Sequence, residues 1–397
     1  MDAAVIVDVI LVAVIIAAFV SGWRQGALRA VLSMVGVVAG LIVGLAIAPL
    51  LVNLAETRAV KLVILLAVVV LFVGMGNMVG LVVGSGVRER ARFRSTHVLD
   101  SVVGSAFQAL VVALVTWFIS IPLATSVPGA VGDGIRNSAV LGAIDSAAPA
   151  GLESLPGRLA ALLNDSGLPP LVSPFATPGG QQVDAPDAAA VDPEVVDRVS
   201  PSVVHVMGDA GVCGRKLMGS GFVAAEDYVI TNAHVVAGTE AVNLDTVLGV
   251  KPAEVVYYRP DVDIAVLYSE RLGLEPIPLA QEGLARGDNA VVMGYPRSGP
   301  FEAAPARVRS RINISGPDIY STGRVEREAY TLRGNVRQGN SGGPLLTPEG
   351  EVAGVIFGAS VDSSDTGYAL TLDQVLSAVG PLQSHTTPAD TQSCVVG

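Results

Sequence analysis

Charged residues are scarce in this sequence. Asp, Glu, Lys and Arg make up 15% of its 397 residues, whereas hydrophobic residues make up 51%. Soluble globular domains carry about a quarter charged residues, so this composition excludes a single ordinary soluble domain. It also excludes an intrinsically disordered chain, which would be poor in apolar residues. The length is that of two or three domains.

Cysteine is almost missing as well. Two cysteines are too few for a disulfide-dense mini-domain or a cysteine-rich zinc site. The sequence also lacks the spacing of metal ligands and the repeats of a solenoid. We therefore expect neither a metal nor a cofactor.

Basic residues become the minority after residue 122. Residues 1–122 hold 8 Lys/Arg and 5 Asp/Glu, a net charge of +3; the rest hold 17 and 31, a net charge of −14, and the two sum to −11. Nucleic acids attract positively charged surfaces. We therefore expect no nucleic-acid partner.

Long apolar runs occur only in the first third of the chain. Each of four runs is long enough to cross about 30 Å of hydrocarbon as a helix; they cover residues 3–22, 30–52, 60–84 and 102–122. The first run has no basic segment before it, which favours a retained span over a cleaved signal peptide. The sequence thus predicts a four-helix transmembrane domain at 1–122, with the lipid bilayer as its partner.

The loops between these runs differ in positive charge. Loops 23–29 and 85–100 together hold six Lys/Arg, and loop 53–61 holds two. Because positively charged loops stay in the cytoplasm, we predict a multi-pass protein of the cell membrane. Both termini, and everything after residue 122, are then extracytoplasmic (periplasmic).

Small and acidic residues interrupt the apolar runs. Two glycine stripes of four-residue spacing allow close helix packing; they are Gly36, Gly40 and Gly44, and Gly76, Gly80 and Gly84. Asp8 lies inside the first run, where a carboxylate is costly; it is either a functional group or a side chain that reaches the interface. A transporter or sensor, with the later domain as output or binding module, is the alternative function.

Two short segments resemble the membrane domain of the colicin V production protein family, namely Trp-Arg-Gln-Gly at 23–26 and Leu-Asp-Ser-Val-Val-Gly at 99–104. This resemblance implies a membrane bundle and no known chemistry. Residues 123–192 follow as a spacer rich in Ala, Gly, Pro and Ser. It contains one candidate amphipathic helix at 152–163 and a flexible linker at 169–186.

Residues 193–397 change to short β-rich runs separated by Gly, Pro, Asn and Asp. The runs cover residues 203–207, 221–223, 228–231, 265–268, 290–293 and 352–357. This pattern is typical of an all-β sandwich or barrel. The one helix-length periodic segment is 373–379.

Three motifs in this last domain carry chemistry. The Gly-Asn-Ser-Gly-Gly-Pro run at 339–344 exposes Ser341 on a tight turn, and the N–H groups of Gly339 and Ser341 form a candidate oxyanion hole. His234 ends a predicted strand as a candidate general base. Asp263 precedes a buried strand, where a carboxylate can orient the histidine.

The chain order His, Asp, Ser is that of the double-barrel proteases. Together with Gly-Ser-Gly-Phe-Val at 219–223 and Met-Gly-Tyr-Pro at 293–296, the three motifs resemble the chymotrypsin-like serine proteases, and more closely their bacterial high-temperature-requirement branch. This resemblance covers about residues 195–380. It implies a double β-barrel and a serine endopeptidase acting on proteins or peptides. It also favours Asp263 over its neighbour Asp261, because the family's acid directly precedes Ile-Ala-Val-Leu.

The substrate pocket is expected beside the nucleophile, with Asn335, Gln338, Phe357, Gly358 and Ala359 as candidate lining residues. The other histidines lie away from the motifs: His205 is expected to be structural, His97 lies in a loop and His385 in the tail. The alternative interpretation is a binding module without catalytic activity.

The high-temperature-requirement branch usually continues into a PDZ domain. Only 397 − 341 = 56 residues follow Ser341 here, so we expect no PDZ-mediated partner. Four spans joined to such a protease are similar to the membrane-anchored acid-resistance proteases of mycobacteria. The resemblance implies substrates in the cell envelope and a role in acid and stress resistance.

Cys213 and Cys394 are the two cysteines, and both fall in the predicted extracytoplasmic domain. An oxidising compartment favours a disulfide between them. The alternative is two separate buried thiols.

Overall fold

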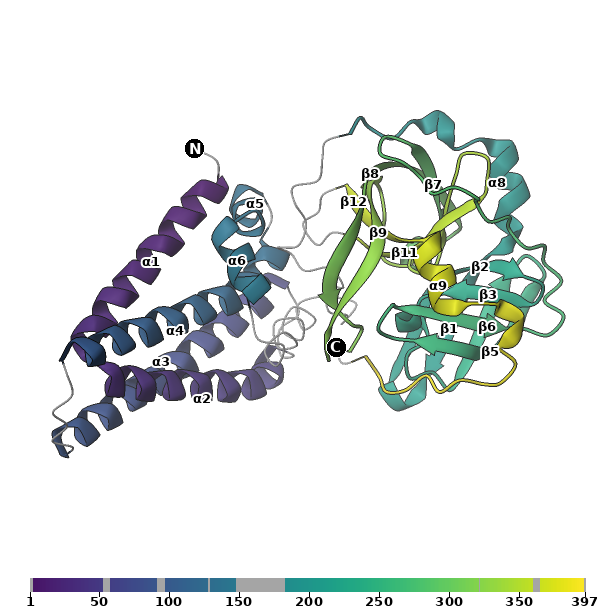
Figure 1. The fold of residues 1–397 in the computed structure, drawn as a ribbon. Coiled ribbons are helices and arrows are strands. Elements are labelled where there is room, and N and C mark those ends of the chain that lie inside the picture. The colour runs from purple at the N-terminus through teal and green to yellow at the C-terminus, as the bar shows by residue number, and fades with distance from the viewer. Residues whose placement is uncertain are drawn as a thin grey trace. The chain divides into compact units, whose positions relative to one another are not determined.

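The computed structural model of the chain describes residues 3–52, 58–90, 97–127, 129–147, 183–320, 322–359 and 365–395. These residues divide into two compact units, at 1–165 and 166–397, which Figure 1 shows in purple to blue and in teal to yellow. The candidate helix at 152–163 and most of the linker at 169–186 lie outside the described residues.

The first unit is built from four long apolar helices, as the hydropathy predicts. They are α1 (Ala3–Gln25), α2 (Ala27–Val52), α3 (Arg58–Arg90) and α4 (His97–Ser126). Each contains a segment long and apolar enough to cross a membrane. The chain is therefore a multi-pass membrane protein in contact with a lipid bilayer.

The glycine stripes let α2 and α3 touch along their backbones. A Cβ added at Gly36 would lie 2.0 Å from the Gly76 carbonyl oxygen, and one added at Gly80 would lie 2.2 Å from the Leu32 carbonyl oxygen. Neither position has room for any larger residue. Close packing of the helices therefore accounts for the stripes.

Two short helices that the sequence pattern did not predict follow α4, namely α5 (Ala130–Arg136) and α6 (Ala139–Ala147). The Asp8 carboxylate on α1 accepts hydrogen bonds from the Ser138 hydroxyl (2.5 Å) and from the Ala139 and Val140 N–H groups (3.2 Å each). These N–H groups begin α6, where a helix has unpaired donors. Asp8 thus anchors the start of α6 against the first span.

The second unit contains two closed six-stranded antiparallel barrels (Figure 1), which confirms the predicted fold class. The first, in the order β1-β2-β3-β6-β5-β4, is formed by β1 (Val203–Ala210), β2 (Arg215–Ala225), β3 (Tyr228–Thr231), β4 (Ala241–Thr246), β5 (Gly249–Arg259) and β6 (Ile264–Tyr268). The second, in the order β10-β11-β12-β9-β8-β7, is formed by β7 (Asn289–Gly294), β8 (Glu302–Pro317), β9 (Arg324–Gly334), β10 (Pro344–Leu346), β11 (Val352–Ala359) and β12 (Thr366–Thr371).

Short helices complete this unit. They are α8 (Pro193–Val199), α9 (Leu372–Val379) and the 3₁₀ turns η1 (Ala188–Ala190), η2 (Ser200–Ser202), η3 (Gly211–Cys213), η4 (Ala233–Val235), η5 (Pro296–Ser298) and η6 (Leu382–Ser384). The periodic segment at 373–379 is thus helical, within α9.

The inner strands of the two barrels are continuous apolar runs in the sequence, because both faces of each strand are buried. On β3, Val229 belongs to the interior of the first barrel, whereas its neighbour Ile230 belongs to a larger core shared with residues of the second barrel such as Met293 and Val355. Alternate side chains of a strand point to opposite faces. The shared core therefore fixes the two barrels against each other.

A disulfide joins Cys213 to Cys394, as predicted. The tail before Cys394 runs along the first barrel: the Gly238 N–H donates to the Thr391 carbonyl (3.0 Å), and the Thr391 hydroxyl donates to the Thr239 carbonyl (3.0 Å). Gly238 is four residues after His234. The tether therefore supports the loop that follows His234.

We expect Cys213→Ser to destabilise this domain and to lower its activity. The bond closes a loop of 181 residues, which in the chain-entropy account is worth about 5 kcal/mol. Thermal unfolding and peptide hydrolysis measure the two effects. Cys394→Ser and the double variant remove the same bond, so the three variants should agree. Two alkylatable thiols in the non-reduced wild type would contradict the prediction.

Candidate active site

His234 stands on a short turn that ends β3. The strand stops after Thr231, and η4 carries His234 with only 7% of its surface exposed. The side-chain amide of Asn232 donates to the Asp263 carbonyl oxygen (2.7 Å). This bond ties the histidine turn to the turn that carries the acid.

Asp263 lies between β5 and β6 and is completely buried. Its two carboxylate oxygens contact His234: Oδ1 accepts from the backbone N–H (3.0 Å), and Oδ2 lies 2.8 Å from Nδ1. The carboxylate therefore holds both the imidazole, through Nδ1, and the backbone of the turn that carries it. Asp261 instead pairs with Arg259 (3.1 Å) and is 44% exposed.

The direction of Asp263 depends on an unusual backbone conformation. Its φ is +69°, in the left-handed region that costs a residue with a Cβ about 1–2 kcal/mol. In this conformation the Asp263 side chain points into the protein, whereas that of the nearby Asp261 points to the surface. Surrounding contacts must hold the turn in this state.

Ser341 comes from the second barrel, in the turn before β10. Gly339 (φ +95°) and Gly342 (φ +82°) flank it. A Cβ at Gly339 would lie 2.4 Å from the Tyr295 carbonyl oxygen, and one at Gly342 would lie 2.2 Å from the Ser220 carbonyl oxygen. The glycines are therefore required for the turn and for its close approach to the first barrel.

The two barrels meet at this turn. The Ser220 N–H on β2 donates to the Ser341 carbonyl (2.8 Å). A Cβ at Gly219 would lie 3.0 Å from that same carbonyl oxygen and 2.6 Å from the side chain of Val235, the residue after His234. Ser341 and the histidine turn thus share one neighbour on β2.

The two peptide planes that carry the candidate oxyanion donors are held by hydrogen bonds to their carbonyls. The Gln338 carbonyl accepts from the Arg297 N–H (2.7 Å), and the Asn340 carbonyl accepts from the Gly343 N–H (2.9 Å). The Ser220 hydroxyl donates to the Gly339 carbonyl (2.7 Å), in the peptide between these two. In a trans peptide the N–H points opposite to the C=O. The Gly339 N–H therefore points away from Arg297.

The candidate pocket residues lie on two adjoining segments. A Cβ at Gly367 of β12 would lie 2.2 Å from the Val336 side chain, and Gly367 pairs with Ala359, so the segment around Val336 lies near the end of β11. Phe357 differs from the others, because its side chain is 2% exposed and belongs to the shared core. Gly358 and Ala359 are the last two residues of β11.

The other described histidine side chains have structural surroundings. His205 stacks on Tyr295 with ring centroids 5.1 Å apart, and burial lowers its pKa, an effect that nearby Asp245 opposes. His385 packs on Tyr257 at 4.7 Å. Within the described ranges, no three His, Cys, Asp or Glu residues gather as metal ligands would.

Comparison with known proteins decides the family. The trypsin-like peptidase domain family matches residues 219–355, and the colicin V production protein family matches residues 7–149. Serine protease Rv3671c of Mycobacterium tuberculosis is 42% identical over 313 residues, which are 78% of this chain and 78% of the relative. This chain belongs to the trypsin-like serine proteases. It is therefore a membrane-anchored serine endopeptidase, whose substrates are proteins or peptides.

Solved structures agree with this assignment of the serine protease. The active form of the Rv3671c protease from M. tuberculosis is similar with a TM-score of 0.54 and 42% identity, over 56% of this chain and 97% of that one. Serine protease HTRA4 of Homo sapiens is 31% identical over 170 residues, which are 41% of this chain and 35% of the relative.

Two residues that support the site were not found from the sequence of this protease. Ser220 is completely buried; besides donating to Gly339 it accepts from the Tyr295 N–H (2.9 Å). The Gly-Ser-Gly run at 219–221 was the available signal for it. Arg327 is one of many arginines in its region, and only the fold shows that it is buried.

Proposed function

We propose that this serine endopeptidase cleaves peptide bonds with His234, Asp263 and Ser341 as its catalytic triad. The observation that carries the proposal is the double contact of the Asp263 carboxylate with His234, at Nδ1 (2.8 Å) and at the backbone N–H (3.0 Å). A carboxylate in this place holds the imidazole proton on Nδ1, which leaves Nε2 free to act as a base.

The reaction then runs in two halves. His234 takes the hydroxyl proton of Ser341 as its Oγ attacks the peptide carbonyl, and later gives this proton to the leaving amine. The N–H groups of Gly339 and Ser341 stabilise the negative charge of the tetrahedral intermediate. Water, activated by His234, hydrolyses the acyl-enzyme. Asn335, Gln338, Gly358 and Ala359, with the backbone of Phe357, border the bound side chain.

The proposed site of action is the extracytoplasmic face of the membrane. The charge of the loops supports this orientation, with six Lys/Arg in loops 23–29 and 85–100 against two in loop 53–61. Substrates are then cell-envelope proteins. By its similarity to the mycobacterial proteases, the enzyme serves acid and stress resistance.

A reporter that is active only outside the cytoplasm tests the orientation. Fused after Pro128 it should be active, and fused at Arg92 it should be inactive, because Arg92 lies in the most positively charged loop. A cytoplasmic reporter at the same two positions is the control and should give the reverse. The opposite pattern would place the protease domain in the cytoplasm.

Proteomics of the cell envelope tests the substrate class. Cleaved envelope proteins should be found in cells with the wild-type enzyme and not in cells with Ser341→Ala, and growth in acid should depend on the same serine. Equal cleavage and equal acid tolerance in the two strains would contradict this part of the proposal.

A further inference from the structure

Arg327 is a charged side chain that the protein buries almost completely. It lies on β9 of the second barrel, opposite Ile314 on β8, and is 1% exposed. Burial lowers the pKa of Arg327, and attraction to the carboxylates of Asp263, Asp318 and Asp261 opposes this shift. Removing a guanidinium from water is costly, and a buried charge is a poor source of stability.

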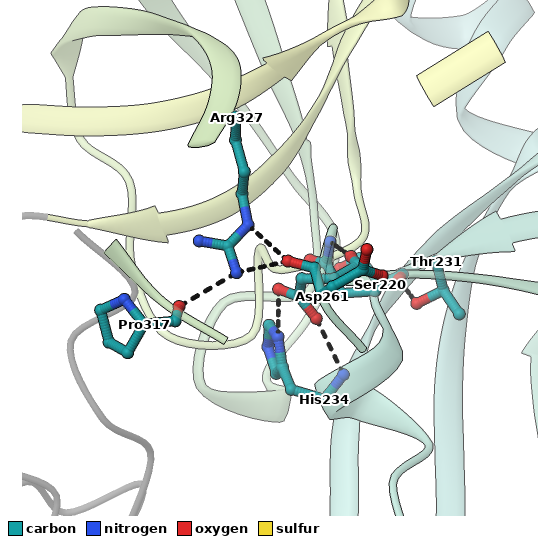
Figure 2. Close-up of polar contacts among 8 residues, drawn as sticks. Ser220, Thr231, His234, Asp261, Pro317 and Arg327 are labelled. Atoms are coloured by element: carbon teal, nitrogen blue, oxygen red, sulfur yellow. Dashed lines mark hydrogen bonds and ion pairs between the residues drawn. The ribbon is translucent and has the colours of Figure 1, made fainter. Parts of the chain in front are cut away.

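The contacts of Arg327 reach across to the first barrel. Its Nε and Nη2 both donate to the carbonyl oxygen of Asp261 (3.0 and 2.6 Å), and Nη2 also donates to the Pro317 carbonyl (3.0 Å) (Figure 2). The planar guanidinium thus binds one carbonyl oxygen through two N–H donors, which fixes both the position and the direction of that peptide.

The Asp261 carbonyl, which Arg327 binds, lies two residues before Asp263. Between them the chain must enter the left-handed conformation of Asp263, with φ +69°. Asn232 holds the far side of the same turn through the Asp263 carbonyl oxygen (2.7 Å). Asn232 belongs to the first barrel, whereas Arg327 is a contact through which the second barrel, which carries Ser341, sets the position of the acid.

We propose that Arg327 is a positioning residue for peptide hydrolysis, which from the second barrel holds the Asp261–Asp263 turn so that the Asp263 carboxylate stays against His234. The inference rests on the triad of the proposed function. A rigid link of this kind matters because a displacement of about 1 Å in a catalytic group can cost about 100-fold in rate.

Three variants of the full-length protein test the inference. Arg327→Met removes the charge and the hydrogen-bond donors. Arg327→Lys keeps the charge but loses the planar pair of donors that binds the Asp261 carbonyl. Arg311→Met is the control, because Arg311 lies on β8 of the same hairpin and pairs with Glu328 and Asp373 at the surface. Active sites are titrated with a fluorophosphonate, and kcat and KM for a peptide substrate are measured per titrated site.

We expect Arg327→Met to lower kcat by about 10- to 100-fold with KM within about twofold, because substrate contacts are unchanged while the acid is misplaced. Arg327→Lys should fall between this variant and the wild type, and Arg311→Met should keep the wild-type kcat. A residue that only joined the barrels would change the melting temperature and the titratable fraction, but not kcat per site.

Wild-type kcat per site in Arg327→Met would overturn the inference. If Arg327→Met does not fold, Arg327→Lys decides: a lowered kcat at unchanged KM supports the role, and a wild-type kcat overturns it. These outcomes are distinct from failure of the proposed function. In that case the wild-type protein would not be labelled at Ser341, whatever residue stands at position 327.

Discussion

Replacing Ser341 with alanine is expected to abolish peptide hydrolysis, with a loss in kcat of about 10⁶-fold, the size seen when a catalytic serine is removed. The hydroxyl is the attacking group, and neither its neighbours nor water can replace it at comparable rate. The backbone of the turn should survive, because its bonds are made by main-chain atoms: the Ser341 carbonyl with the Ser220 N–H, and the Gly342 N–H with the Ile356 carbonyl (2.8 Å each).

Covalent labelling and hydrolysis measure this prediction together. A fluorophosphonate should label the wild-type chain at Ser341 and leave Ser341→Ala unlabelled, while the two proteins melt at similar temperatures. Ser384→Ala is a matched control, because the Ser384 hydroxyl is exposed and donates to a carbonyl of its own turn, that of Pro381 (2.6 Å). Hydrolysis by Ser341→Ala at the wild-type rate would refute the assignment of the nucleophile, and labelling of the wild type at another serine would redirect it.

The fold was predictable because burial leaves a strong mark on this sequence. Membrane spans must be apolar over their whole length, and the inner strands of the barrels are apolar on both faces, as Val229 and Ile230 illustrate. The helices α5 and α6, of 7 and 9 residues, were not predicted. They are too short for a periodic pattern, and the start of α6 is held by Asp8, which lies 130 positions from Ser138 in the sequence.

The candidate site also has a part that the sequence predicts and a part that it does not. His234, Asp263 and Ser341 stand in motifs whose local chemistry is readable, namely a turn between glycines and polar residues at strand ends. Ser220 and Arg327 act through contacts 119 and 66 residues away in the sequence. No local pattern marks such pairs. The sequence also could not show that the left-handed φ of Asp263 directs it away from the exposed Asp261.

Asp263→Asn is expected to lower kcat by about 10⁴-fold, the scale known for this change in a serine protease triad, without unfolding the domain. The asparagine side chain keeps one acceptor oxygen and gains an NH2 donor. The buried N–H of His234, now bonded to Oδ1 (3.0 Å), needs that acceptor. The NH2 group then faces Nδ1, which must accept a hydrogen bond. The imidazole proton therefore moves to Nε2, the nitrogen that has to receive the proton of Ser341.

The kinetic signature separates this cause from a loss of substrate binding. KM should change by no more than about threefold, because Asp263 is buried behind the histidine and contacts no substrate. Asp373→Asn, the same substitution at a 71% exposed residue of α9 that pairs with Arg311, should keep the wild-type kcat. A kcat for Asp263→Asn within about tenfold of the wild type would show that another group orients His234. The double contact seen here would then be structural, and the role proposed for Arg327 would fall with it.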